Sequence, residues 1–509
     1  MSKSPAAIAL SIGLIASACN AEQVTFDDDD DGGSTDSPSG GGVDGGGPGD
    51  TPGPGVTPEA LVPADGIVVE RVVAYQGIER PIMEFGEEAT SSIPLIAERP
   101  ALVRVFYNAE GPASVTARLS VDDEVLEVTG QVSGRSDDGR LSSTLNFEVP
   151  PELMRFGARY RVDVLQTASV SAGGSNTGRY PTDVEATFTM PFERGEALDI
   201  VLVPVRYTAD GSGRLPDVSD IQIAAYREEF MARYPVTEVN LTVRMPIDSI
   251  GPIQPNGAGW SEILERIREV RELDRPAPAT YYYGIFSPTP SLGSFCGRGC
   301  VAGLGFLPDP SFASGRVAVG LGYSGADSIE TAVHEIGHNH GRQHAPCGVR
   351  DSDRSFPHSN GRIGAYGYHL FTGEIKGPST YNDMMGYCDP TWVSDYTYEA
   401  LANRIAIVGA QSDARYAPED LDRVYDRFLV DGEGRITKLD PMTFHRPPTG
   451  SLVETEVVTE AGQRITIEGH FYRYDHLPGG TLIVPQERRA GVIEAKLEGN
   501  WMSIHPTFK

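Results

Sequence analysis

The chain has 509 residues, with 71 acidic and 42 basic side chains and a formal net charge of −29 at pH 7. This charge argues against nucleic acid as a partner, because its phosphates would be repelled. The 58 glycines and 38 prolines are too many for a helical bundle and indicate β-rich domains with a flexible segment. At about 150 residues per domain, the length predicts two to four domains.

Residues 1–19 are expected to be an export signal. Lys3 precedes an apolar stretch that ends at Ala18, shorter than the roughly 20 residues that a membrane-spanning helix needs. The sequence Ala16-Ser17-Ala18-Cys19 resembles a bacterial lipobox with Cys19 as the lipidated residue, and a plain signal peptide is the alternative. We therefore expect an exported protein, either a lipoprotein anchored to a membrane at the cell envelope or a secreted protein.

Residues 20–55 form an acidic segment rich in glycine and proline, with nine acidic and no basic residues between Glu22 and Asp50. Such a segment has too little apolar surface to offset the entropy of ordering, so we expect a disordered linker. The five aspartates at 27–31 could bind calcium, but a solvated run of charge is the simpler interpretation.

Residues 56–195 show short runs of alternating apolar and polar residues without a clear helix, which predicts a β-sandwich-like domain. The expected strands cover residues 67–73, 101–107, 117–121, 159–164 and 186–190. No catalytic motif occurs among them.

Residues 196–411 alternate between strand and helix patterns, and residues 412–509 return to hairpins of a small all-β domain, in which we identify no site. In the middle segment, strands are expected at 199–207, 238–245, 280–286, 301–307 and 316–321, with helices at 218–233 and 261–273. Ser261 is the expected N-cap of the second helix, and Leu273 is expected to face inward. A further helix is expected to begin at Asp327 or Ser328.

That further helix leads into the sequence HEIGHNHGRQH, residues 334–344, which has the spacing HExxHxxGxxH. His334 and His338 would lie one turn apart on one helix face, so that both could bind one metal ion. Glu335 could then bond to a metal-bound water without being a ligand. Gly341 permits a left-handed turn that would bring back His344.

Three imidazoles leave the fourth position of a tetrahedral zinc ion open, which is the catalytic arrangement. The alternative is an amphipathic helix with incidental histidines. His340 lies about 200° around the helix from His338, so it should point away from the metal.

This pattern resembles the metzincin clan of zinc endopeptidases, which also have a methionine turn beneath the metal. The sequence Tyr381-Asn382-Asp383-Met384-Met385-Gly386-Tyr387 is similar to that turn, with Met385 as the floor of the site and Met384 as the alternative. The resemblance implies that Tyr387 stabilises the transition state. The alternative is that Tyr387 is a tyrosine of the hydrophobic core. Asp383 stands where the clan usually has serine.

The order of strands and helices in residues 196–411 also looks like that of a metzincin, with 301–307 as the edge strand and 394–408 as the final helix. The resemblance implies an α+β catalytic domain with one catalytic Zn²⁺, in which the zinc-bound water is activated by Glu335. An extended peptide could pair with the edge strand. The helix at 261–273 is an addition to the usual plan of the clan.

Apart from Cys19, the four cysteines fit an oxidising compartment and allow three pairings. The resemblance favours Cys347–Cys388, because those regions meet beneath the metal in the clan, and it leaves Cys296–Cys300 to close a small loop. A second metal site is the alternative.

The sequence thus predicts a multidomain zinc endopeptidase that acts outside the cytoplasm on protein or glycoprotein substrates. The alternative is a surface-anchored binding protein with a vestigial metal site, and hydrolysis of a non-peptide amide is a third possibility. Neither the cleavage specificity nor the oligomeric state follows from the sequence.

Overall fold

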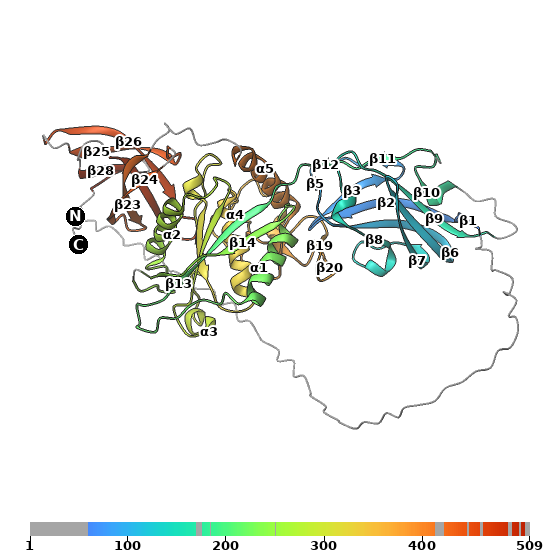
Figure 1. Ribbon diagram of the computed structural model, residues 1–509, viewed down its shortest axis with the longest axis horizontal. Coiled ribbons are helices and arrows are strands. Elements are labelled where there is room, and N and C mark those ends of the chain that lie inside the picture. Colours follow the sequence, from blue (N-terminus) through green and yellow to red (C-terminus); the bar gives the residue numbers. More distant parts are fainter. Residues whose placement is uncertain are drawn as a thin grey trace, which may run out of the picture.

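The computed structural model describes residues 60–168, 176–183, 185–249, 251–412, 422–444, 447–458, 462–486, 491–497 and 500–503. The expected export signal with Cys19, the linker and the aspartates 27–31 lie outside these residues. The described part is multidomain and mostly β, with few helices, and its three bodies follow one another along the long axis (Figure 1). None of its helices has the length and apolar character needed to cross a membrane.

The N-terminal body is a ten-stranded sheet that wraps around one hydrophobic core. Its path is β1-β9-β6-β2-β3-β4, with β7 and β8 beside β6 and with β10 and β11 beside β9. The strands in this region are β1 (Leu61–Pro63), β2 (Ile67–Tyr75), β3 (Glu79–Glu84), β4 (Glu87–Glu88), β5 (Leu95–Ile96), β6 (Ala101–Val121), β7 (Glu124–Arg135), β8 (Leu145–Val149), β9 (Arg159–Thr167), β10 (Arg179–Tyr180), β11 (Phe188–Thr189) and β12 (Phe192–Glu193).

The two strands expected at 101–107 and 117–121 are one long strand, β6. Its first half pairs with β2 and β8 and its second half with β9, and a bulge interrupts its pairing with β7 between Ala109 and Ala113. Gly111 and Pro112 lie in that bulge. A bulge accommodates a residue that cannot donate to the ladder, so these two residues bend the strand instead of ending it.

The central body has a sheet in the order β14-β13-β16-β18-β17, in which the first four strands are parallel and the edge strand β17 is antiparallel. The strands of this body are β13 (Leu198–Arg206), β14 (Val239–Val243), β15 (Ile247–Asp248), β16 (Tyr281–Phe286), β17 (Gly303–Gly305), β18 (Val317–Leu321), β19 (Gly367–His369), β20 (Glu374–Lys376), β21 (Asn382–Asp383) and β22 (Thr391–Trp392). The helices are α1 (Asp220–Arg233), α2 (Trp260–Asp274), α3 (Leu292–Cys296), α4 (Ala326–Asn339) and α5 (Asp395–Ser412).

The two faces of this sheet are covered by different helices. Tyr281 and Tyr283 of β16 pack in the core that contains α1 and α4, whereas Tyr282 packs in the core that contains α2. Alternate residues of a strand point to opposite faces, which accounts for this division. Helix α4 therefore lies against the sheet, over β18 and the edge strand β17.

The expected helix starts and one inward position were wrong. Helix α2 begins at Trp260, after Gly259 in a left-handed conformation with φ 85°, so Ser261 is not its N-cap. Helix α4 begins at Ala326, which places Ser328 inside the helix and buries it. Leu273 is 74% exposed, because at 100° per residue it lies about 120° around α2 from buried Ile267 and so off the apolar face.

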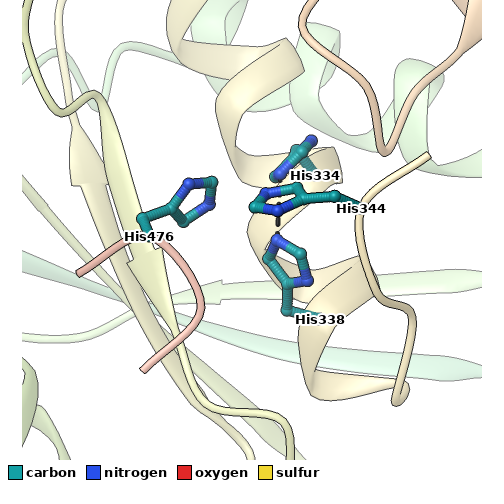
Figure 2. Close-up of side chains that lie close together, drawn as sticks. All are labelled: His334, His338, His344 and His476. Carbon is teal, nitrogen blue, oxygen red and sulfur yellow. Dashed lines mark hydrogen bonds between the residues drawn. The ribbon is translucent and has the colours of Figure 1, made fainter. Parts of the chain in front are cut away.

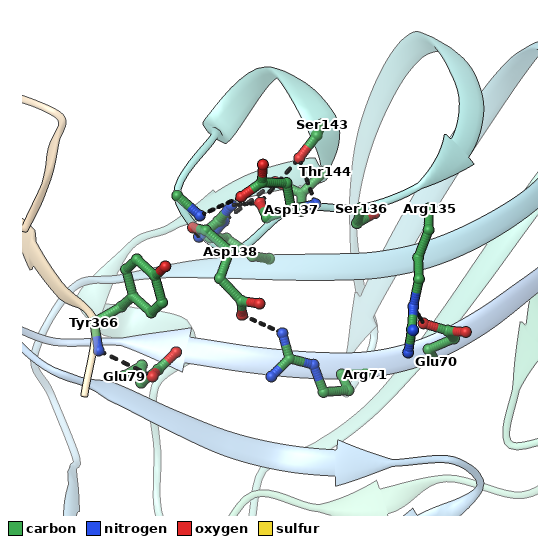
Figure 3. Close-up of polar contacts among 12 residues, drawn as sticks. Glu70, Arg71, Glu79, Arg135, Ser136, Asp137, Asp138, Ser143, Thr144 and Tyr366 are labelled. Carbon is green, nitrogen blue, oxygen red and sulfur yellow. Dashed lines mark hydrogen bonds and ion pairs between the residues drawn. The ribbon is translucent and has the colours of Figure 1, made fainter. Parts of the chain in front are cut away.

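The N-terminal body is joined to the central body by backbone and side-chain contacts (Figure 3). Ile78 and Gly367 form an antiparallel bridge, and the Tyr366 N–H donates to the Glu79 carboxylate at 2.9 Å. The Trp392 indole N–H donates to the Gly77 carbonyl at 2.8 Å. These contacts lie at the side of the central body where β19 and β20 are found.

The C-terminal body is a seven-stranded sheet in the order β24-β23-β27-β26-β25-β28-β29. Its strands are β23 (Arg423–Asp431), β24 (Ile436–Phe444), β25 (Ser451–Val458), β26 (Arg464–Arg473), β27 (Gly479–Pro485), β28 (Gly491–Leu497) and β29 (Asn500–Ser503). It packs against α2, where buried Arg427 lies 2.9 Å from Glu265. Tyr472 stacks on Phe312 of the central body, so the two bodies share one hydrophobic core.

Candidate metal centre

Helix α4 and the turn after it bring the three predicted ligands together (Figure 2). The Nε2 atoms of His334 and His338 are 2.9 Å apart, as expected for residues one helical turn apart. After the helix, Gly341 adopts the left-handed φ of 81°. A Cβ atom at this position would meet the Arg404 guanidinium. The chain turns there, and the ring of His344 comes to lie 4.9 Å from that of His338.

The hydrogen bonds of the two helical histidines determine which nitrogens face the centre. His334 Nδ1 lies 2.7 Å from the Met384 carbonyl, and His338 Nδ1 lies 2.6 Å from the Arg342 carbonyl. A carbonyl only accepts hydrogen bonds, so each Nδ1 carries the proton. In the neutral rings, both Nε2 atoms then present lone pairs to the same point.

Burial supports the neutral form of His334. It lowers the pKa of His334 well below its ordinary value, and the neighbouring imidazoles of His338, His476 and His344 lower it further. Neutral imidazoles whose lone pairs converge need a cation between them. Nitrogen donors of this kind suit zinc, so the residues present fit a metal ion.

The predicted methionine turn lies directly beneath this cluster. Met385 is buried, and its sulfur packs so closely on Gly337 of α4 that a side chain there would meet it at 2.5 Å. Asp383, which stands where the metzincin clan usually has serine, is also buried. Its carboxylate accepts from the Met385 N–H at 2.8 Å and from the Ser394 N–H at 3.0 Å. It thereby fixes the turn, and burial raises its pKa.

Tyr387 and Glu335 flank the same cluster. The Tyr387 hydroxyl lies 3.1 Å from His344 Nε2, and burial raises the pKa of this phenol, so it stays protonated and able to donate. Glu335 packs against the edge strand β17, where a side chain at Gly303 would collide with its carboxylate. The absence of a side chain at this position places the carboxylate beside the edge strand.

His340 does not join the cluster. Its ring stacks on Tyr281 at 4.4 Å, and its Nδ1 lies 2.8 Å from the Ile336 carbonyl. The remaining cysteines form two disulfides, Cys347–Cys388 and Cys296–Cys300, which is the pairing that the resemblance favoured. The first of these joins the segment after His344 to the segment after Met385.

The C-terminal body also reaches the cluster, although the sequence suggested no site there. The loop that joins β26 to β27, residues 474–478, carries Asp475 and His476. Asp475 Oδ2 lies 2.8 Å from His338 Nε2 and 2.9 Å from His344 Nε2. His476 joins His334, His338 and His344 in a group whose candidate ligand atoms all lie within 4.8 Å of one another (Figure 2).

His476 is directed at the other polar groups of the site. Its Nε2 lies 2.9 Å from Glu335 Oε1, and its Nδ1 contacts the Tyr387 hydroxyl. Within the described part of the chain, no hydrogen bond satisfies Glu335 Oε2, although it is buried. The only signal for this contact in the sequence was an Asp-His pair at a hairpin tip, which gives no spatial information.

The Asp475 carboxylate is ionised. Burial by itself raises its pKa, but the charge and hydrogen bonding of His338, followed by those of His344, outweigh burial and hold the pKa well below its usual range. A buried anion of this kind requires a cationic partner, which protonated imidazoles or a metal ion would supply. Because burial keeps His334 neutral, a metal ion satisfies the whole cluster better than protons do.

No protein-family model matches this chain, and no curated protein sequence is similar to it. Among solved structures, that of metalloproteinase-II from Bacteroides fragilis is similar at 13% identity and a TM-score of 0.22. The match covers 61% of this chain and 82% of the Bacteroides chain. A likeness at this level is too low to assign a fold or an activity.

Proposed function

We propose that this protein is a zinc endopeptidase of the metzincin type that cleaves protein substrates outside the cytoplasm. The observation that carries the proposal is the convergence of His334, His338 and His344 above Met385, with Glu335 beside them. Five groups that HExxHxxGxxH and the methionine turn predicted from local sequence thus lie close together.

The three histidines would hold the zinc ion, and Met385 would support their rings from below. When bound, zinc supplies a Lewis acid that polarises the scissile carbonyl and makes a water molecule more acidic. Glu335 would take the proton of the attacking water and deliver it to the leaving amine. Tyr387 would donate a hydrogen bond to the developing oxyanion.

The edge strand gives the substrate its path. β17 pairs on one side with β18 in antiparallel register, and Glu335 lies against its residues Gly303 and Gly305. An extended peptide that pairs with β17 would therefore run past the base. This arrangement suits a protein or glycoprotein chain better than a small amide.

Two disulfides, and the absence of a membrane-crossing helix from the described residues, fit an extracellular protein. A lipid anchor on Cys19 belongs to the same proposal. Its test is the mass of the mature N-terminus after expression in a bacterial host, which would show a diacylated cysteine.

The activity test uses the purified full chain and an unfolded protein such as casein. We expect slow cleavage that a chelator abolishes and added zinc restores, and we expect none from Glu335→Gln. Cleavage that persists in chelator would contradict the proposal. A chain that holds zinc but never cleaves would instead favour the surface binding protein.

A further inference from the structure

We propose that Asp475 is a fourth ligand of the metal and that the 474–478 loop of the C-terminal body holds the peptidase in a closed, latent state. The inference rests on the proposed function and adds the regulation of that same site. It is carried by contacts of the loop with the ligands, the base, the tyrosine and the edge strand.

The first contact is that of Asp475 with the ligand atoms. In a tetrahedral zinc site with bonds of about 2.0–2.1 Å, neighbouring ligand atoms lie about 3.3 Å apart. Asp475 Oδ2 lies 2.8 and 2.9 Å from two of the three imidazole nitrogens. One ion could bind all of these atoms if the distances between them widened slightly. Carboxylate oxygen is an ordinary zinc ligand, and a fourth protein ligand would close the site.

His476 is the less suitable fourth ligand, although it belongs to the same group of histidines. Its two ring nitrogens are already directed at Glu335 Oε1 and at the Tyr387 hydroxyl. The His476 ring in that position occupies both the base and the oxyanion donor. The adjacent residues 475 and 476 therefore engage the metal position and the two groups that act on the substrate.

The third contact is with the edge strand. Tyr474, immediately before Asp475, forms an antiparallel bridge with Phe306, immediately after β17. The rings of these two residues also pack at 5.9 Å. The loop therefore pairs with the strand segment on which an extended substrate would have to lie.

Together these contacts distinguish latency from a catalytic role of the loop. A group that assists catalysis must leave room for the scissile peptide between the base, the metal and the oxyanion donor. Asp475 and His476 fill that space, with side chains only 13% and 11% exposed. A substrate can bind only after the loop has left.

The element that moves is the loop and not the whole C-terminal body. The body is held on α2 by the buried Arg427–Glu265 pair and by the Thr481 hydroxyl, which donates to Glu265 at 2.7 Å. The base of the loop is closed by a hydrogen bond from the Tyr474 N–H to the Gly479 carbonyl at 3.2 Å and by a contact of the Tyr474 and Thr481 hydroxyls at 2.9 Å. Opening the loop therefore breaks fewer contacts than undocking the body.

The test compares the full wild-type chain with Asp475→Ala/His476→Ala and with the control Glu433→Ala, which removes an exposed acid from a neighbouring hairpin. We expect the double variant to keep one zinc and to cleave casein about 10-fold faster or more, because its competent fraction rises. We also expect a chelator to remove its zinc about 10-fold faster, since one ligand of four is missing. The control should match the wild type in both measurements.

A folded, zinc-loaded double variant whose cleavage is unchanged or slower would overturn the proposal and leave the peptidase assignment standing. If instead no form of the chain cleaves casein, the proposed function fails, while the chelation rates still decide whether Asp475 is a ligand.

A second measurement needs no substitution. The cobalt-substituted wild-type chain is titrated with acetohydroxamate, a small metal-binding probe, and its visible spectrum is recorded. If the site is closed, we expect no spectral change below millimolar concentrations of acetohydroxamate. A change at micromolar concentrations of the probe would overturn the proposal. If the alanine variant fails to fold, Asp475→Asn, which keeps the shape of the side chain, should bind the probe more tightly than the wild type.

Discussion

The two β bodies both dock on the central body, yet only one of them reaches the metal centre. The N-terminal body contacts the side of the central body away from the ligands, where the Tyr398 hydroxyl donates to the Gln76 carbonyl at 2.8 Å. The C-terminal body extends Asp475 and His476 to the histidine cluster and to Glu335. The difference shows that one loop, rather than the fold of a flanking domain, decides whether that domain reaches the cluster.

The largest expected effect on cleavage comes from a residue of the central body, and the effects of the flanking bodies are compared with it. Glu335→Gln keeps the shape of the base but removes its ability to accept a proton, so we expect cleavage of casein to fall about 10³-fold with zinc retained. The control is Glu330→Gln on the same helix, which is partly exposed and pairs with Arg233. Equal rates for Glu335→Gln and Glu330→Gln would remove Glu335 from the mechanism.

The next effect concerns the tyrosine that the C-terminal loop engages. Tyr387→Phe, made together with the Asp475→Ala/His476→Ala pair, separates its catalytic role from its contact with His476. Loss of an oxyanion donor predicts a kcat about 10²-fold lower with little change in KM. An unchanged kcat would identify Tyr387 as a structural residue.

A smaller and matched pair of substitutions compares the two docking surfaces directly. Thr481→Val removes a hydroxyl that donates to the buried Glu265 carboxylate, and Tyr398→Phe removes one that donates to the Gln76 carbonyl. We expect the free energy of unfolding to fall by about 2 kcal/mol for the first, whose partner is charged, and by about 1 kcal/mol for the second.

Only one variant of this pair should change the activity. Thr481→Val also removes the partner of the Tyr474 hydroxyl at the base of the loop, so the loop should open more often and cleavage should rise, whereas Tyr398→Phe should leave cleavage unchanged. Denaturant unfolding and casein assays on both variants provide the comparison. A rise in both, or in Tyr398→Phe alone, would mean that the N-terminal body also restrains the site.

The elements that could be predicted from sequence are those set by local geometry. The spacing of His334 and His338 is fixed by the helix, and Gly341 allows the turn that returns His344. The strand and helix pattern of the central body followed from apolar periodicity for the same reason. The Cys347–Cys388 pairing depended on the family resemblance and not on the spacing of the cysteines.

What could not be predicted depends on tertiary contacts or on single backbone conformations. Asp475 lies well over 100 residues beyond the helix that it meets, and an Asp-His pair at a hairpin tip has no periodicity that would reveal its neighbour. The start of α2 was misplaced because Gly259 adopts a left-handed conformation there without a side-chain cap. The joining of two expected strands into β6 required a bulge at Pro112 that looked like a turn.

The most direct test of the central claim is the metal content of the purified full chain compared with that of His338→Ala. This histidine contributes Nε2 to the cluster and is fully buried, so its loss removes one of the three imidazole ligands. We expect one zinc per wild-type chain and almost none in His338→Ala after dialysis against a weak chelator. A wild-type chain without metal, or equal zinc in both proteins, would contradict it.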